Sequence, residues 1–185
     1  MTASPAAAQP AVNPFTDVEE GKYYTDAVLW AYSHEPQVTN GTSADKFSPD
    51  MTCTRGQVVT FLWRAAGCPE PKSLDNPFQD VASTAWYFKP VLWAVEQKIT
   101  NGTAADKFSP EQTCSYAHVL TFLYRAAGSP NAENSPNRQW YHDALTWAVN
   151  NKFITGTGLE HTVYPTDSCP RCDVVTYLYR YYGSK

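Results

Sequence analysis

The chain has 185 residues, a formal net charge of −4 and a pI near 5.5. Its content of 43% hydrophobic and 14% aromatic residues is that of a folded protein and excludes the disordered class. The acidic balance offers no basic surface stripe, so we expect no nucleic-acid partner. The apolar runs follow helix faces and do not reach 18 residues, so we expect no membrane insertion.

One pattern occurs three times along the chain. The offset between the first two copies is 63 residues from Trp30 to Trp93 and 61 from Asn40 to Asn101. Between the second and third copies it is 54 residues, from Trp93 to Trp147. Units of this size rarely close a core alone, so we expect the three copies to share one.

The composition outside the repeats sets the domain limits. We expect residues 1–12, rich in Ala and Pro, to be a flexible lead-in, with Met1 a start placed on a fragment of a longer secreted protein. The predicted repeats are 13–68, 76–129 and 135–185. The linkers at 68–75 and 129–139 are rich in Pro, Asn and charged residues, which is typical of surface crossings.

Each copy predicts a first helix that follows a pair of aromatic residues. The pairs are Tyr23-Tyr24, Trp86-Tyr87 and Trp140-Tyr141. Asn40-Gly41 and Asn101-Gly102 are turn dipeptides that end the helical region. The Phe-Ser-Pro segment that follows each turn is expected to be extended, because the residue before proline avoids the helical region.

A second helix in each copy is marked more strongly. Thr54-Arg55-Gly56-Gln57 matches a capping box, and apolar residues then recur at helical spacing. Gly67, Gly128 and Gly183 stand where left-handed C-terminal caps are expected. Three similar apolar stripes predict a mainly all-α fold with a central three-helix bundle and the first helices outside it. The residues expected to be buried together are Phe61, Leu62, Phe122, Leu123, Tyr177 and Leu178.

The five cysteines do not indicate a metal or redox centre. Cys53, Cys114 and Cys169 occupy one repeat position, which we interpret as a buried packing site rather than a zinc site. The sequence Cys169-Pro170-Arg171-Cys172 has no second CxxC beside it. No His, Cys or carboxylate pattern indicates catalysis, so we expect no cofactor, no metal and no enzymatic activity.

Together these motifs resemble the S-layer homology (SLH) domain. The resemblance rests on Phe-x-Asp-Val, the loop Gly, Phe-x-Pro, the Thr-Arg helix start and the Arg-Ala-x-Gly helix end, in that order. It implies a three-pronged, pseudo-threefold module of helix–loop–helix repeats. It also implies binding to a secondary cell-wall polysaccharide, an anionic glycan that carries pyruvate in some members, in grooves between repeats.

The resemblance places ligand residues unevenly among the copies. Arg55 and Arg171 match the helix-start Arg, whereas the second copy has Tyr116, so we expect two competent grooves and one degenerate groove. A first-turn Arg beside free backbone amides is suited to a carboxylate. The predicted glycan-binding residues are Arg55, Arg171, Gln57, Gly41, Gly102, Trp30, Trp93, Trp147 and Tyr116. The alternatives are that each Arg only joins repeats through Asp17 or Asp80, and that the Trp residues form core.

These observations lead to one functional hypothesis and one alternative. The hypothesis is a non-catalytic, extracellular module, monomeric and fused to other domains, that anchors a bacterial surface protein to the cell wall. The alternative is a protein-interaction module on the same fold, with a bacterial or host partner.

Overall fold

The computed structural model describes residues 12–130, 138–161 and 164–183. Within them the regular secondary structure is helical, which confirms the predicted all-α class. The predicted lead-in, apart from Val12, and the predicted start of the third repeat at 135–137 lie outside the described residues. The helices are α1 (Thr25–Ser33), α2 (Arg55–Ala65), α3 (Phe88–Glu96), α4 (Tyr116–Ala126), α5 (His142–Asn150), α6 (Gly158–His161) and α7 (Arg171–Tyr182).

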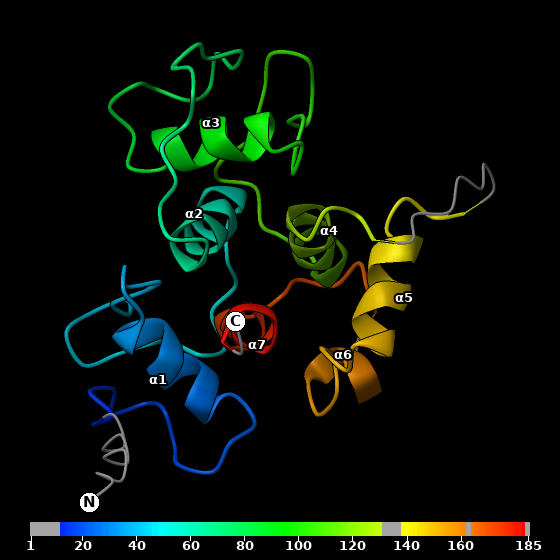
Figure 1. Ribbon diagram of the computed structural model, residues 1–185. Coiled ribbons are helices and arrows are strands. Elements are labelled where there is room, and N and C mark those ends of the chain that lie inside the picture. The colour runs from blue at the N-terminus through cyan, green and yellow to red at the C-terminus, as the bar shows by residue number, and fades with distance from the viewer. Residues whose placement is uncertain (1–11, 131–137, 162–163, 184–185) are drawn as a thin grey trace, which may run out of the picture.

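The second helices of the three repeats, α2, α4 and α7, form the central bundle. Figure 1 looks along this bundle and shows α1, α3 and α5 around it. The six residues predicted to share the core are all buried, and Tyr177 is fully enclosed. The predicted arrangement of a bundle with the first helices outside it is therefore confirmed.

Each outer helix packs against a bundle helix of a different repeat. Helix α3 of the second repeat lies on α2 of the first, and α5 of the third repeat lies on α4 of the second. The ring closes because α1 of the first repeat lies on α7 of the third. A prong in space is therefore assembled from two neighbouring repeats, and each repeat contributes to two prongs (Figure 1).

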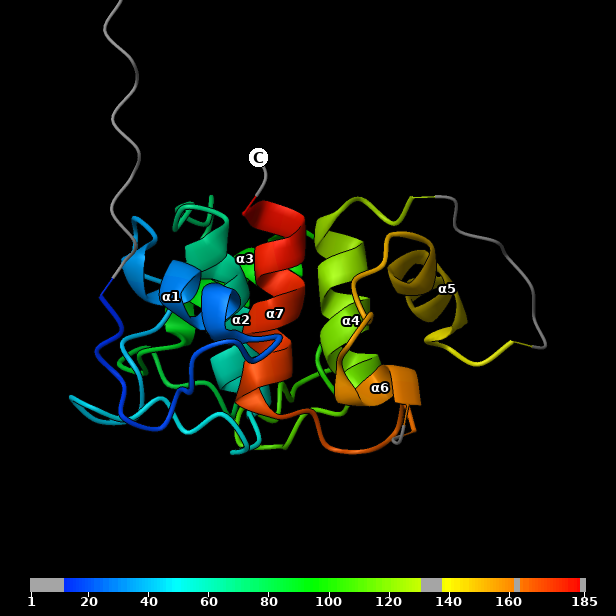
Figure 2. The same cartoon turned by 90° about the horizontal axis from the view of Figure 1, so that it is seen from below.

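The segments that lead into the bundle helices meet at one end of the bundle. The amide of Cys114 donates to the carbonyl of Cys53 at 2.9 Å, and the amide of Cys169 donates to the carbonyl of Cys114 at 3.0 Å. All three thiols are completely buried, as expected for a packing site. Figure 2 shows the loops gathered at this end and the C-terminal end of α7 at the other.

The helix ends follow most of the predicted chemistry. Thr54 and Gln57 form the predicted capping box, and Ser115 and His118 form a second one. Gly67 and Gly128 have φ of +88° and +85°, as predicted. The prediction for Gly183 is wrong. Its φ is −68°, because its amide continues the helix by donating to the carbonyl of Tyr179 at 2.7 Å.

The prediction of an extended Phe-Ser-Pro segment is also wrong at its serine. Ser48 and Ser109 both have φ of +59°. The carboxylate of Asp17 accepts the amides of Phe47 and Ser48, both at 2.9 Å, and Asp80 holds Phe108 and Ser109 in the same way. Two amides aimed at one carboxylate require a tight turn, so side-chain hydrogen bonding overrides the ordinary preference before proline.

Candidate functional site

The two helix-start arginines occupy matching junctions between repeats. The Nε of Arg55 donates to the carbonyl of Phe108 at 2.9 Å, and its Nη2 donates to Thr100 Oγ1 at 3.3 Å. Its guanidinium lies 4.9 Å from the ring centre of Phe108 and 5.2 Å from that of Phe122. The first repeat thereby holds the loop of the second.

Arg171 makes the same contacts between the third and first repeats. Its Nε donates to the carbonyl of Phe47 at 2.9 Å, and its Nη2 donates to Thr39 Oγ1 at 3.2 Å. Its guanidinium lies 4.9 Å from the ring of Phe47 and 5.2 Å from that of Phe61. Burial lowers the pKa of both guanidinium groups from a value far above neutrality, so they remain charged.

The backbone amides beside these arginines are not free, contrary to the expectation. The amides of Arg55 and Gly56 donate to the carbonyls of Gln112 and Pro110 at 2.8 and 2.9 Å. The first amides of α7 are taken up in the same way by the carbonyls of Met51 and Pro49. The neighbouring repeat therefore satisfies the donors that a helix start would otherwise offer to an anion.

Arg55 and Arg171 are each only 3% exposed. Direct contact with a polymer would require the loop over each guanidinium to move. Their role as ligand residues stays a prediction, and the geometry favours the alternative in which they join repeats. The hydrogen bonds of each guanidinium run to carbonyl and hydroxyl groups, while Asp80 and Asp17 hold the loop amides and interact favourably with the charges of Arg55 and Arg171.

The junction that lacks an arginine is built around a buried carboxylate. Tyr116 donates its hydroxyl to Asp173 Oδ2 at 2.9 Å, and Tyr23 donates its hydroxyl to Asp173 Oδ1 at 2.7 Å. Asp173 is fully enclosed, and burial raises its pKa even though both hydroxyls favour the charged form. This one side chain links all three repeats, so Tyr116 has a joining role of its own.

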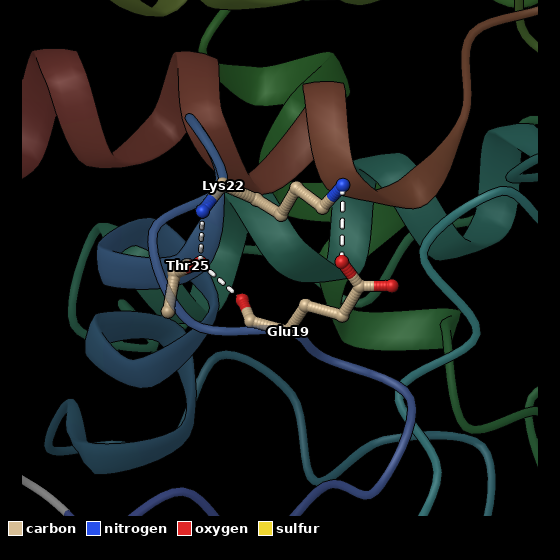
Figure 3. A network of polar contacts seen from close by, with 3 residues as sticks. All are labelled: Glu19, Lys22 and Thr25. Carbon is tan, nitrogen blue, oxygen red and sulfur yellow. Dashed lines mark hydrogen bonds and ion pairs between the residues drawn. The ribbon is translucent and has the colours of Figure 1, made fainter.

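Tyr23 reaches this carboxylate from a turn just before α1. The hydroxyl of Thr25 donates to the carbonyl of Glu19 at 2.7 Å and accepts the amide of Lys22 at 3.1 Å. Figure 3 shows these contacts and the ion pair between Lys22 Nζ and Glu19 Oε2 at 3.0 Å. The ion pair is exposed and contributes little to stability, so the two hydrogen bonds of the Thr25 hydroxyl are the main side-chain interactions that hold the turn.

In the second and third repeats the position equivalent to Tyr23 is an exposed tryptophan, Trp86 or Trp140. Trp86 is 60% exposed and Trp140 is 56% exposed, each two residues before the start of an outer helix. Trp140 lies beside His118, with ring centres 5.0 Å apart. The sequence shows both residues within its repeated aromatic pairs, but the predicted sugar-binding role falls on other tryptophans.

The remaining predicted site residues lie in different surroundings. Trp93 is buried, whereas Trp30 and Trp147 are half-buried among aromatic side chains, so the three serve chiefly as packing. Gln57 accepts the amide of Thr54 in the capping box. At Gly41 and Gly102 an added Cβ would meet a backbone carbonyl and a phenylalanine ring, which explains glycine there. The structure thus brings the arginines and loop glycines to the junctions, and it places Trp30 beside Tyr179 and Trp147 beside Tyr124 of a neighbouring repeat, within the aromatic packing of the prongs. Their role in glycan binding stays a prediction.

The sequence model of the S-layer homology domain matches residues 14–59 and 77–120. The first two repeats are S-layer homology domains. The third repeat has an equivalent helix pair, and its Arg171 repeats the contacts of Arg55 with different loop residues. We therefore treat it as a third copy of the same unit.

Curated relatives carry similar segments. The chain is 34% identical over 155 residues to a cell surface protein of Thermoanaerobacter kivui, covering 82% of this chain and 19% of that protein. It is 32% identical over 113 residues to an endoglucanase of Bacillus sp. strain KSM-635, covering 61% and 12%. It is 32% identical over 85 residues to a surface layer protein of Brevibacillus choshinensis, covering 44% and 8%. The chain thus spans less than a fifth of the length of these relatives.

None of the helices in the described part of the chain is both long and apolar enough to cross a membrane. No group of three or more His, Cys, Asp or Glu residues in that part is arranged to hold a metal ion.

Proposed function

We propose that this chain is an extracellular, non-catalytic module that anchors a larger bacterial protein to the cell wall by binding a secondary cell-wall polysaccharide at the junctions between repeats. The observation that carries the proposal is the repeated junction, at which one repeat grips the loop of the next and an exposed aromatic ring stands before the outer helix. Two of the three named relatives are a cell surface protein and a surface layer protein, and all three are much longer than the matched segment, which supports an anchoring role.

The exposed indoles are the surface that we assign to sugar contact. Trp86 and Trp140 present flat apolar faces, and the CH face of a pyranose packs on such rings. Arg55 holds the loop of the second repeat, the repeat that carries Trp86, and Arg171 holds that of the first repeat, and both add positive charge to the molecule, which suits an anionic polymer. Trp140 lies beside His118, at the junction that has Tyr116 in place of an arginine. We propose in addition that Arg55 and Arg171 bind a carboxylate group of the polymer directly.

Sedimentation of the chain with purified wall sacculi tests the anchoring function. We expect co-sedimentation with native sacculi and its loss after acid extraction of the secondary polymer. Co-sedimentation that survives extraction would instead favour the alternative of a protein or peptidoglycan partner. Trp86→Ala and Trp140→Ala should weaken binding, whereas Leu74→Ala, which removes an exposed apolar side chain from a linker, should not.

The arginines are tested in the same assay together with thermal unfolding. Arg55→Ala and Arg171→Ala should each weaken binding about tenfold or more, since each removes charge-assisted hydrogen bonds worth about 1.5–3 kcal/mol. Weakened binding in a variant that keeps its helical circular dichroism supports a ligand role. Unchanged binding in both folded variants would leave the arginines as joining residues only.

A further inference from the structure

The first repeat carries two extra residues between its first helix and its turn. Trp30 and Asn40 are ten positions apart, whereas Trp93 and Asn101 are eight apart. The same backbone hydrogen bond closes both versions, from Val38 to the carbonyl of Ala31 at 2.9 Å and from Ile99 to the carbonyl of Ala94 at 2.8 Å. The extra residues therefore bulge outward without altering the frame of the repeat.

The bulge and the following turn border a shallow hollow of ≈ 440 Å³ that is open to solvent. Its lining consists of Tyr32, Gln37 and the turn at residues 40–44. The counterpart of Tyr32 in the second repeat is Val95, and Gln37 belongs to the longer connection, so both lining side chains are peculiar to the first repeat. The volume lies within the range of small-molecule sites.

The polar groups of this hollow are only partly used. Gln37 is fixed because its Nε2 donates to the carbonyl of Tyr32 at 2.8 Å, which leaves its own side-chain oxygen as an acceptor. Across the described residues, the side-chain amide of Asn40 and the hydroxyl of Tyr32 have no hydrogen-bond partner. The ring of Tyr32 is held edge-on by Phe15, with centres 5.4 Å apart.

The chemistry of the lining selects a class of ligand. It combines amide and hydroxyl groups with one aromatic ring and contains no charged side chain. An anion would find no cation there, and an apolar ligand would bury polar groups without partners. A pyranose offers hydroxyls for the amides and a CH face for the ring. We propose that this hollow is a subsite for an uncharged hexopyranose, with Tyr32 as its stacking face and Asn40 and Gln37 as its hydrogen-bonding groups.

The identification of the sugar as part of a wall glycan rests on the proposed function, whereas the subsite itself does not. The probe is N-acetylglucosamine, titrated into the full isotope-labelled chain while backbone amide resonances are followed by NMR. N-acetylneuraminic acid, which carries a carboxylate, is titrated in parallel. We expect saturable shifts at residues 37–44 with the neutral sugar, weaker ones with the acid, and none at the equivalent turn around Asn101.

Three variants sharpen the experiment. Tyr32→Val installs the side chain that the second repeat has at this place, and Asn40→Ala removes a side-chain amide that has no partner within the described residues. Each substitution should lower the affinity for N-acetylglucosamine about tenfold. Asn101→Ala, at a turn without the bulge, is the matched control and should leave affinity unchanged. Circular dichroism confirms that each variant is folded. Shifts that do not saturate, or that appear equally at both turns, would overturn the subsite.

Parallel sedimentation with sacculi separates the two proposals. Sacculus binding without saturable shifts at residues 37–44 overturns the subsite and leaves the anchoring function standing. Saturable shifts without sacculus binding overturn the anchoring function and support the subsite.

Discussion

At the scale of single residues, two buried guanidinium groups hold the repeats together by hydrogen bonds to carbonyl and hydroxyl groups. A buried charge is tolerated only when its donors are satisfied, and Arg55 meets this with a carbonyl, a hydroxyl and two aromatic faces. The planar guanidinium of arginine donates to both acceptors at once from two nitrogen atoms, which the single ammonium nitrogen of lysine cannot do in the same geometry. The residue therefore contributes to stability whether or not it also contacts a ligand.

Arg55→Lys should lower the free energy of unfolding by roughly 2–3 kcal/mol, because it breaks two hydrogen bonds made by a buried charge. Arg64→Lys is the control, since Arg64 makes one bond of 3.1 Å to the carbonyl of Val38 at a half-buried site. Urea unfolding of the three proteins measures the difference. Equal losses in both variants would show that the junction adds nothing beyond an ordinary helix-end arginine.

Asp173 gives the chain a defined dependence on pH. Its pKa in the folded chain is raised above the ordinary value, chiefly by burial. A raised pKa means that the folded state binds the proton more tightly, so this stabilising contribution is complete below the unfolded pKa and is lost as pH rises through the folded pKa. Tyr23 and Tyr116, which face the carboxylate, have pKa values raised by burial and stay neutral in this window.

Asp173→Asn should therefore gain stability relative to the parent chain as pH rises from about 4 towards neutrality. Thermal unfolding of both proteins across this range measures the difference in Tm. Asp17, whose stabilising effect changes with pH in the opposite direction, is present in both proteins, so its effect cancels in this difference. Burial alone would raise the pKa of Asp17, but hydrogen bonds from the amides of Phe47 and Ser48 lower it. A difference in Tm that stays constant with pH would rule out the proposed titration of Asp173.

At the scale of the element, the loop glycines separate steric contact from backbone strain. Gly41 has φ of +88°, and an added Cβ would meet the carbonyl of Lys46 and the ring of Phe15. Gly67 has the same φ of +88°, but nothing lies within 4 Å of its added Cβ. Both positions therefore have the same unfavourable φ, but only at Gly41 would an added side chain also clash with neighbouring atoms.

Gly67→Ala should cost about 1 kcal/mol, which is the strain of a positive φ. Gly41→Ala should cost about 3 kcal/mol or more, because the turn must also shift away from Phe15. Chemical unfolding compares the two variants. Similar decreases in the free energy of unfolding of the two variants would mean that the turn shifts easily, and that the close packing around Gly41 contributes nothing to stability.

The sequence predicts the helices well because their signals are local. The capping box at Thr54 and the apolar spacing that follows it depend on residues within a few turns. The surroundings of Arg55 were not predictable, since the carbonyl of Phe108 that it binds lies 53 positions away. Ser48 escaped prediction for a similar reason, because the carboxylate that bends its backbone belongs to Asp17.

At the scale of the whole molecule, repetition leaves the pairing of helices ambiguous. Three equivalent first helices and three equivalent second helices satisfy the same apolar stripes whether each pair forms within a repeat or between repeats. The structure pairs them between repeats and closes the ring through α1 and α7. Loss of one repeat should therefore damage prongs at both of its borders, and the intact chain should unfold in one cooperative step.

A chain truncated after residue 130 tests this pairing directly. It keeps two complete repeats, but α1 loses its partner α7 and α4 loses its partner α5. We expect amide hydrogen exchange to leave α2 and α3 as the protected pair, with α1 and α4 exchanging much faster than in the intact chain. If prongs instead formed within repeats, α1 would pair with α2 and α3 with α4, and all four helices would stay protected. Strong protection of α1 in the truncated chain would therefore contradict ring closure by α7, whereas its selective loss would show that the third repeat completes the first.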